Sequence, residues 1–253
     1  MKNDITCEIY HDCFQNFEKY NLPKAQLILS DIPYSVGADF YASRPEWYID
    51  RDIQSGQSDK AGKAAFETDY NFDIPEYFRF CSQMIKDEPK TGEKDAPCMI
   101  IFCAFQQIPV VIQQAERHGF KKYIPLVFCK KYSPQVLKSN MKIVGATEYA
   151  LVLYRNKLPK FRNRDENGKG HMVFNWFVWQ KDNSEVPRIH PSQKPINLLK
   201  RLIEIFTDAE DVIIDPCAGS GSTLVAARDL GRNSYGFEIN GDFFQKAKAQ
   251  ITC

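Results

Sequence analysis

The sequence predicts an α/β fold in which helices cover both faces of a doubly wound sheet. Short apolar segments alternate with helical patterns along the chain, as they do in βαβ units. Cys98–Phe105 is apolar without a break, which is typical of a strand buried on both faces. Val212–Glu238 reads as strand, glycine-rich turn, helix and strand. A chain of 253 residues fits one such domain, so we expect a single domain over residues 1–253.

In the first half of the chain, alternating or wholly apolar runs predict strands and apolar spacing predicts helices. The spacing of Phe14 and Phe17 indicates a short helix, and Gly119 ends a longer one. The expected elements are strand Ile5–Tyr10, helix Phe14–Tyr20, strand Leu27–Leu29, helix Phe72–Lys86, strand Cys98–Phe105, helix Ile108–His118 and strand Tyr123–Cys129.

In the second half, Pro195 stands where helices commonly begin, and Gly231 follows the end of a helical pattern. The expected elements are strand Glu148–Tyr154, helix Ile196–Phe206, strand Val212–Ile214, helix Leu224–Leu230, strand Ser234–Phe237 and helix Asp242–Gln250. Lys130–Met141 is expected to be a polar, basic connection.

Composition narrows the classes of protein. The 33 basic residues balance 32 acidic ones, so any nucleic-acid surface must come from local clustering. Eight cysteines include no C-x-x-C pair, which argues against a zinc site, and we expect no metal. No apolar run reaches the length of a membrane span, and the first residues lack the apolar region of a signal peptide. We therefore expect a reduced cytoplasmic protein with no membrane partner.

The first motif lies in Ala25–Gly37. The apolar run Leu27–Leu29 stops at Asp31, and Pro33 takes the backbone out of any sheet ladder because it has no N–H. A carboxylate and the Tyr34 ring therefore follow the C-terminal end of a strand, which is where open α/β sheets bind ligands. The alternative is an ordinary strand-to-loop corner with Asp31 in an Asx-turn.

The second motif follows the strand Val212–Ile214. Its glycines let the backbone approach a ligand at a helix N-terminus, and Glu238 is placed to hold ribose hydroxyls, which indicates a nucleoside cofactor. Leu224 occupies the third small position of a dinucleotide fingerprint and would hold helix and strand apart. Asp215 would repel a pyrophosphate but suits a cationic ligand. S-adenosylmethionine, an adenosine with a positive amino-acid tail, therefore fits better than NAD.

Two segments interrupt the α/β rhythm. Ala38–Asn71 is long and mostly polar, and we expect residues 38–71 to form a mobile loop over the site, with Arg51, Lys60 and Lys63 facing phosphates. The alternative is a surface loop without a partner. Arg155–Ile189 carries a basic run followed by aromatic residues, a combination that suits phosphates and bases. The alternative is a solvated insertion with an aromatic hairpin packed on the core.

Three motifs together resemble one family. Asp31-Ile32-Pro33-Tyr34 resembles the Asp/Asn/Ser-Pro-Pro-Tyr motif of amino-directed DNA methyltransferases, although Ile32 replaces the first proline. Asp215–Gly221 resembles their S-adenosylmethionine motif, with Cys217 in place of phenylalanine, and His190–Pro195 resembles their His-Pro-x-Gln-Lys-Pro segment. The order of these motifs is that of the β class of N6-adenine and N4-cytosine enzymes. The resemblance covers nearly the whole chain.

The resemblance implies a Rossmann-like methyltransferase sheet, circularly permuted so that the cofactor-binding half is C-terminal, and a role for each matching residue. The catalytic residues would be Asp31, Ile32, Pro33 and Tyr34. The cofactor-binding residues would be Asp215, Pro216, Ala218, Gly219, Gly221, Thr223, Glu238, Ser192 and Lys194. The insertion 155–189 would recognise the target, and its DNA-binding residues would be Arg155, Lys160, Arg162, Arg164 and Lys169.

The resemblance also implies the reaction. Asp31 and the Ile32 carbonyl would accept the two hydrogens of an exocyclic amine, and Tyr34 would stack on a base flipped out of the duplex. Asp in the catalytic motif favours N6 of adenine over N4 of cytosine, which stays open as the alternative. The expected partner is duplex DNA, with single-stranded DNA also open. A homodimer is expected from the resemblance alone, and a cognate restriction endonuclease is a further partner that the sequence leaves open.

Other readings remain. A DNA-binding regulator that has lost turnover would not be expected to keep Asp31, Tyr34 and Glu238 together. Methylation of RNA or of a protein glutamine shares the catalytic logic, and the basic insertion favours nucleic acid over protein. Pro216-Cys217 and Pro97-Cys98 imitate the nucleophile of cytosine-C5 methyltransferases but lack the flanking pattern of that family.

Overall fold

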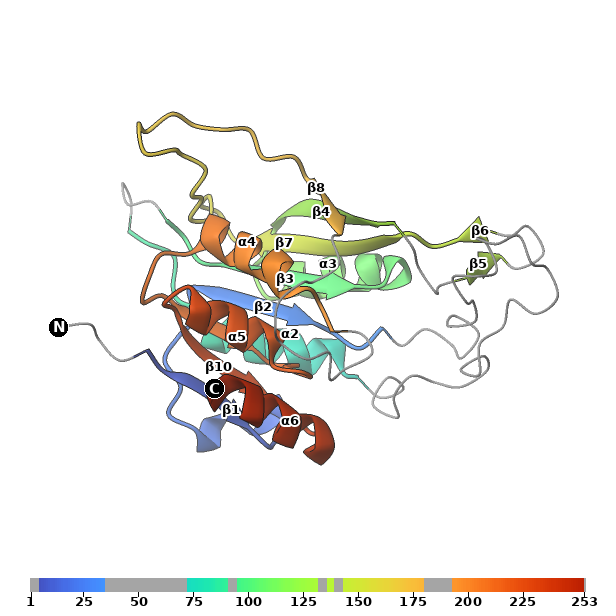
Figure 1. The fold of residues 1–253 in the computed structure, drawn as a ribbon, viewed down its shortest axis with the longest axis vertical. Helices are drawn as coiled ribbons and strands as arrows, with labels where there is room; N and C mark the ends of the chain where they lie inside the picture. The colour runs from blue at the N-terminus through green and yellow to red at the C-terminus, as the bar shows by residue number, and fades with distance from the viewer. Residues whose placement is uncertain are drawn as a thin grey trace.

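The computed structural model describes residues 5–34, 72–90, 95–131, 136–138, 143–179 and 193–252. Over these ranges an eight-stranded sheet has the strand order β1-β10-β9-β2-β3-β7-β4-β8 (Figure 1). Its strands are β1 (Cys7–Tyr10), β2 (Leu27–Asp31), β3 (Cys98–Cys103), β4 (Lys122–Lys130), β7 (Thr147–Tyr154), β8 (Trp176–Trp179), β9 (Val212–Asp215) and β10 (Asn233–Phe237). A separate two-stranded sheet pairs β5 (Val136–Lys138) with β6 (Ile143–Val144). The loop expected over 38–71 lies outside the described residues.

The order of the strands shows the circular permutation that the motif order predicts. Strand β9, which leads into the glycine-rich turn, comes late in the sequence but lies between β10 and β2 near the middle of the sheet. Both pairings are parallel, so β2, β9 and β10 end at the same edge. The two motifs of the sequence are therefore adjacent, although most of the chain separates them.

Strand β7 reverses direction in this sheet, because it is antiparallel to both β3 and β4. Antiparallel neighbours need no crossover helix between them. Tyr149 pairs with Cys103 at one end of β7, and Leu153 pairs with Met99 at the other. The start of β7 thus lies at the edge where β2 and β3 end, and the chain leaves β7 at the opposite edge.

Helices cover both faces of the sheet, as the sequence predicts (Figure 1). One face carries α4 (Ile196–Phe206), α5 (Ser222–Asp229) and α6 (Gly241–Thr252), and the other carries η1 (Phe14–Lys19), α2 (Ile74–Met84), η4 (Phe105–Gln107) and α3 (Ile108–Arg117). Leu27 and Leu29 pack in the first layer and Ile28 packs in the second. Burying both faces of β2 in this way, at about 2 kcal/mol per large side chain, fixes the position of its C-terminal end.

The short helix expected at Phe14–Tyr20 forms as the 3₁₀ helix Phe14–Lys19. Two other elements differ from the sequence prediction. Val136–Lys138, within the expected polar connection, forms a strand. Trp176–Trp179, inside the expected insertion, joins the large sheet as β8 beside β4, where Phe177 stacks on Phe128 with ring centroids 5.3 Å apart. The aromatic half of the insertion is thus part of the core sheet.

Candidate active site at the carboxyl ends of the parallel strands

Three carboxylates lie at the edge where β2, β9 and β10 end. Asp31 is the last residue of β2, Asp215 is the last residue of β9, and Glu238 follows β10. Ile28 pairs with Ile214 and Gly236 with Asp215, so Asp31 and Glu238 each lie about two residues beyond the level of Asp215 at this edge. The structure therefore unites the first and second sequence motifs in one site.

The turn after Asp31 is fixed by its neighbours. The Ile32 N–H donates to the Phe102 carbonyl (3.2 Å), and the Ile32 side chain is buried in the core. The side-chain amide of Gln107 donates to the Pro33 carbonyl (2.7 Å). These contacts hold the backbone where Pro33 leaves the sheet, so the Asp31 carboxylate has a defined position.

The two oxygens of Asp31 have different surroundings. Oδ2 is ion-paired with the Lys194 ammonium. Oδ1 is buried and has no hydrogen-bond partner among the described residues. Burial raises the pKa of Asp31 and the Lys194 charge opposes that rise. A buried carboxylate oxygen without a donor is costly unless a ligand supplies one, so Oδ1 marks a place for a donor group.

Lys194 lies just before α4, and its ammonium is enclosed by acids and rings. It pairs with Asp31 and with Glu148 (3.1 Å), and it lies 5.4 Å from the Tyr34 ring centroid and 5.1 Å from that of Phe102. The resemblance implies a cofactor contact for Lys194. The structure places its ammonium against Asp31, and a cofactor contact stays a prediction. Ser192 lies outside the described residues.

The glycine-rich turn is compact because two of its residues adopt positive φ. Gly219 has φ 52° and Gly221 has φ 73°, a region that residues with a Cβ rarely adopt. Gly221 is the N-cap of α5, and a Cβ on it would lie 3.2 Å from the Cβ of Ala247. The turn therefore presents backbone, and not side chains, at the N-terminus of α5, as a cradle for a ligand requires.

Glu238 and Asp215 border this turn. Glu238 accepts hydrogen bonds from the N–H groups of Gly219 (2.8 Å) and Asn240 (2.7 Å), and burial raises its pKa. Asp215 accepts from the Cys217 N–H (3.0 Å), and burial raises its pKa to about 7 against the opposing hydrogen bond from Thr223. Both carboxylates are thus tied to the turn and sensitive to a cationic neighbour.

Leu224 does not hold α5 away from the sheet, contrary to the sequence expectation. The strand beneath it carries Gly236, where an added Cβ would lie 2.9 Å from Leu224 Cδ1 and 3.0 Å from the Ala218 Cβ. The missing side chain on β10 makes room for the large residue on α5. The helix therefore packs closely on the sheet, and Leu224 does not argue against NAD. The remaining argument is the negative charge of Asp215, which would repel the pyrophosphate of NAD.

The thiol chemistry of the C5 alternative is disfavoured by the site. Burial raises the pKa of Cys217 well above its ordinary value, and Asp215 and Glu238 add to the rise. Cys98 is buried in β3, and burial raises its pKa as well. The thiolate form is the nucleophile, so neither cysteine is poised for attack.

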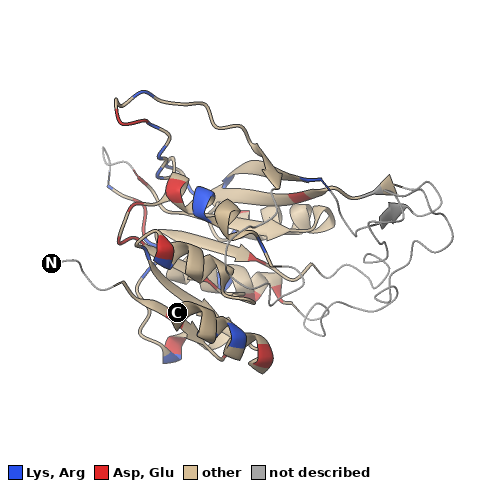
Figure 2. Ribbon diagram, in the orientation of Figure 1, with Lys and Arg blue, Asp and Glu red and all other residues tan. Residues whose placement is uncertain are grey.

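The structure does not bring the basic run of the insertion to this edge. The chain leaves β7 after Tyr154 at the opposite edge, and Figure 1 shows the segment that follows looping out beyond that edge before it returns as β8. Lys160 pairs with Asp208 (2.8 Å) and Asp211 (2.7 Å), and Arg162 pairs with Asp95 (2.8 Å) and Asp208 (2.7 Å). Figure 2 shows basic and acidic segments together at this end.

The other predicted DNA-binding residues are also engaged locally. The Arg155 guanidinium donates to the carbonyls of Lys86 and Ser82, both at 3.4 Å, and lies 4.9 Å from the Phe120 ring. The Arg164 side chain donates to the Gly168 carbonyl (2.7 Å); among the described residues, Lys169 is engaged through its backbone N–H, which donates to Asp165 (2.9 Å), and not through its ammonium. Arg155, Lys160 and Arg162 thus join this end of the protein to itself, because acids and carbonyls distant in sequence meet them there, and a DNA-binding role for them stays a prediction.

Substitution of Arg162 by Ala is accordingly expected to lower the melting temperature by a few degrees and to leave the salt dependence of DNA affinity unchanged. The substitution leaves Asp95 and Asp208 without their shared guanidinium, far from the candidate site. Thermal denaturation and DNA titration over a range of salt concentrations measure the two effects. A smaller salt slope with unchanged stability would support the assignment of Arg162 to DNA binding.

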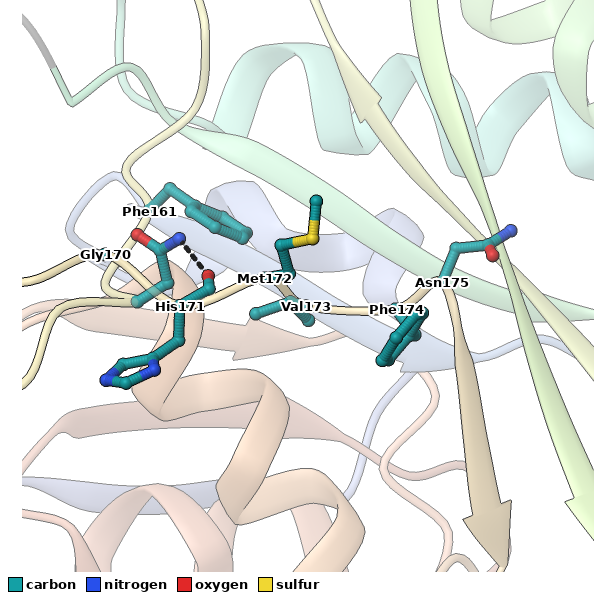
Figure 3. A pocket seen from close by; sticks show the side chains of 8 residues that line it. Phe161, Gly170, His171, Met172, Val173, Phe174 and Asn175 are labelled. Atoms are coloured by element: carbon teal, nitrogen blue, oxygen red, sulfur yellow. Dashed lines mark hydrogen bonds between the residues drawn. The ribbon is translucent and has the colours of Figure 1, made fainter.

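The same excursion lines an open hollow of about 650 Å³ (Figure 3). Its apolar side chains come from Phe161, Met172 and Phe174. The Asn163 side-chain amide donates to the His171 carbonyl (2.6 Å) and so joins the two segments that line the hollow. The hollow contains no carboxylate from the strand ends. It is therefore separate from the candidate active site.

Four residues of the site were missed by sequence reasoning: Gln107, Lys130, Glu148 and Trp179. Lys130 ends β4, Glu148 lies near the start of β7, and Trp179 ends β8. The only sequence signal was a charge next to an apolar strand, and it becomes useful only once the direction of β7 is known.

Among the described residues there is no cluster of His, Cys, Asp and Glu that could hold a metal ion. No helix in the described ranges is long and apolar enough to cross a bilayer.

Comparison with known proteins identifies the class. A family model described as DNA methylase, covering N6 and N4 methyltransferases, matches residues 25–249. The chain therefore belongs to this DNA methylase family. It is 25% identical over 260 residues to the DNA adenine methyltransferase YhdJ of Escherichia coli K12, covering 96% of this chain and 81% of that protein.

Solved structures share the fold. The M1.HpyAVI–SAM complex superposes with a TM-score of 0.65 at 21% identity, covering 97% of this chain and 99% of that one. The cytosine-N4-specific PvuII DNA methyltransferase superposes with a TM-score of 0.65 at 13% identity, covering 98% and 88%. The likeness confirms the Rossmann-like methyltransferase fold, and the family as a whole includes enzymes for both target amines.

Proposed function

We propose that this DNA methylase transfers the methyl group of S-adenosylmethionine to the N6 amino group of adenine in DNA. The observation that carries the proposal is the buried Oδ1 of Asp31, which has no donor among the described residues and lies at the same edge as the glycine-rich turn. An exocyclic amine offers the N–H that this oxygen lacks. The proposal thus joins the two halves of the site in one reaction.

The residues around the turn fit the cofactor. Positive-φ glycines leave the backbone open to the ligand, and Glu238 is placed after β10 to accept hydrogen bonds from ribose hydroxyls. Asp215 supplies negative charge for the cationic amino-acid end, and Pro216, Ala218 and Thr223 shape the turn beside it. Bound there, S-adenosylmethionine supplies a methyl group on a positively charged sulfur.

The residues after β2 would prepare the amine. The lone pair of an exocyclic amine is delocalised into its ring, so the nitrogen is a poor nucleophile. Asp31 Oδ1 and the Ile32 carbonyl would each accept one hydrogen, which favours a pyramidal nitrogen with its lone pair free. Tyr34 would stack on the base after it leaves the duplex. Catalysis would rest on positioning and electrostatics, without a covalent enzyme intermediate.

Adenine is favoured over cytosine by two observations. The catalytic motif carries Asp31, as adenine-directed members of the family usually do, and YhdJ, which is similar over nearly the whole chain, is named an adenine methyltransferase. The N4-cytosine reaction is the second candidate, because the PvuII enzyme shares the fold.

The test is a nucleoside digest. Purified protein is incubated with S-adenosylmethionine and DNA from cells that lack adenine and cytosine methylation, and the digested nucleosides are quantified by mass spectrometry. We expect N6-methyldeoxyadenosine. N4-methyldeoxycytidine would correct the base and keep the reaction. A protein that binds the cofactor but methylates neither double- nor single-stranded DNA would overturn the proposal.

A further inference from the structure

Four charged side chains form an alternating chain beside the predicted target-binding turn. Lys130 contacts Glu148, Glu148 contacts Lys194, and Lys194 contacts Asp31. They come from β4, β7, the segment before α4, and β2. The chain begins at the sheet edge near β8 and ends on the carboxylate that the proposed function places on the amine.

The surroundings make these charges interact strongly. Lys194 is 6% exposed and Glu148 13% exposed, so water screens them little. Trp179 adds its ring to the enclosure, with its centroid 4.7 Å from Lys130 Nζ and 5.8 Å from Lys194 Nζ. The two acids and two bases cancel in formal charge, which lowers the free-energy cost of burying all four side chains together. Removing one of them would leave an uncompensated charge and would be costly.

The geometry distinguishes the two oxygens of Asp31. Lys194 contacts Oδ2 of Asp31 and also Glu148, while Oδ1 of Asp31 has no hydrogen-bond partner among the described residues. The Tyr34 hydroxyl is 3.4 Å from both Glu148 Oε2 and Lys194 Nζ, so the ring proposed to stack on the base is tied to the same pair. Without Glu148, the ammonium could move to lie between both oxygens of Asp31.

We propose that Glu148 is a positioning residue that holds Lys194 on Oδ2 of Asp31, where the ammonium favours the charged carboxylate and leaves its other oxygen free for the target amine. The inference rests on the proposed function for the identity of the amine, but not for the charge state of Asp31.

The directions of the pKa shifts agree with this arrangement. Burial alone would raise the pKa of Glu148, yet Lys194 and Lys130 lower it below its ordinary value. Burial would lower the pKa of Lys194, yet Asp31 and Glu148 raise it. Both shifts favour the charged forms of Glu148 and Lys194.

The titratable groups that face Asp31 from the described residues shift its pKa in both directions. Lys194 and a hydrogen bond from Tyr34 oppose the rise in its pKa that burial causes, and Glu148 adds to that rise. Asp215 faces it from β9 and titrates near pH 7, whereas Tyr34, Cys103 and Cys217 have raised pKa values and stay neutral below that pH. Removal of Lys194 should thus raise the midpoint of Asp31, and removal of the Glu148 charge should lower it.

The experiment follows the Asp31 carboxyl carbon by NMR in protein labelled with ¹³C at the aspartate carboxyl groups, its signal assigned with D31N and separated from that of Asp215 with D215N. We expect K194Q to raise the Asp31 midpoint by about one to three pH units and E148Q to lower it by about one unit. K130Q, which keeps Lys194 in place, should raise it by less. K160Q is the matched control, because Lys160 also lies between two carboxylates but at the other end of the sheet.

Two results would overturn the inference. In the first, the Asp31 midpoint in both K194Q and E148Q stays within 0.3 units of the wild type, a margin well below the roughly one-unit effects expected. In the second, the two variants move the midpoint in the same direction. Single-turnover methylation gives a second readout: E148A should lose at least tenfold in rate with unchanged cofactor affinity, and E148Q should recover most of it. Opposite NMR shifts in a protein that methylates no DNA would support the charge chain and reject the proposed function.

Discussion

Replacing Asp31 with Asn is expected to lower the single-turnover methyl-transfer rate by about a thousandfold, with S-adenosylmethionine affinity changed by no more than about twofold. The amide turns one acceptor oxygen into an N–H donor, which would point at the hydrogens of the target amine. The variant also leaves Lys194 with Glu148 as its remaining acid. Rapid-quench transfer with enzyme in excess measures the rate, and calorimetric titration measures cofactor affinity.

The matched control for this variant is D229N. Asp229 also pairs with a lysine, Lys200 at 2.7 Å, and is about as exposed as Asp31, but it ends α5 away from the strand ends. D229N should retain the wild-type rate within about twofold. A D31N protein that transfers methyl groups as fast as D229N would show that Asp31 does not hold the amine.

Replacing Asp215 with Asn is expected to change stability and cofactor affinity in opposite directions. Burial raises the pKa of Asp215 to about 7. This folded-state pKa lies above the unfolded one, so the folded protein binds the proton of Asp215 more tightly than the unfolded chain does. The free energy of unfolding is therefore larger at low pH, and this gain is lost as the pH rises through about 7. The loss is on the order of 4 kcal/mol for a shift of about three units. The neutral amide avoids it.

D215N should therefore melt several degrees higher than the wild type at pH 8 and show a smaller gain at pH 5. Cofactor affinity should fall at least about tenfold at pH 8, because the anion that faces the cationic ligand is gone. Wild-type affinity should increase from pH 6 to pH 8, and that of D215N should not. Calorimetric scans and titrations at each pH measure both effects. A D215N protein that is less stable than the wild type at pH 8 would contradict the account.

The sequence predicts much of the fold because its signals are local. Val212–Asp215 and Cys98–Cys103 are recognisable as buried strands from their apolar runs, and Ile196–Phe206 forms a helix with the predicted bounds. The glycine-rich turn is recognisable because positive φ requires glycine at 219 and 221. Motif order then predicts the permutation, since the strand before the turn must pair with the strand before Asp31.

The rest depends on contacts between distant parts of the chain. Nothing near Lys160 or Arg162 in the sequence reveals that Asp208 and Asp211 neutralise them, so the basic run resembles a DNA-binding surface. The direction of β7 decides this, because it sends the following segment to the edge opposite Asp31. The same reversal brings Glu148 to the edge that carries Asp31, where no local pattern could have placed it.

The measurement that tests the account most directly is the position of the methyl group in a crystal structure with S-adenosylmethionine. If Asp31 Oδ1 accepts a hydrogen from the attacking amine, the amine nitrogen lies about 3 Å from that oxygen, and the methyl carbon lies about 3 Å from the nitrogen. The methyl carbon must therefore lie within about 6 Å of Oδ1. We predict this distance, with the ribose on Glu238 and the amino-acid end beside Asp215. A cofactor bound at the turn with its methyl group directed away from Asp31 would contradict the account.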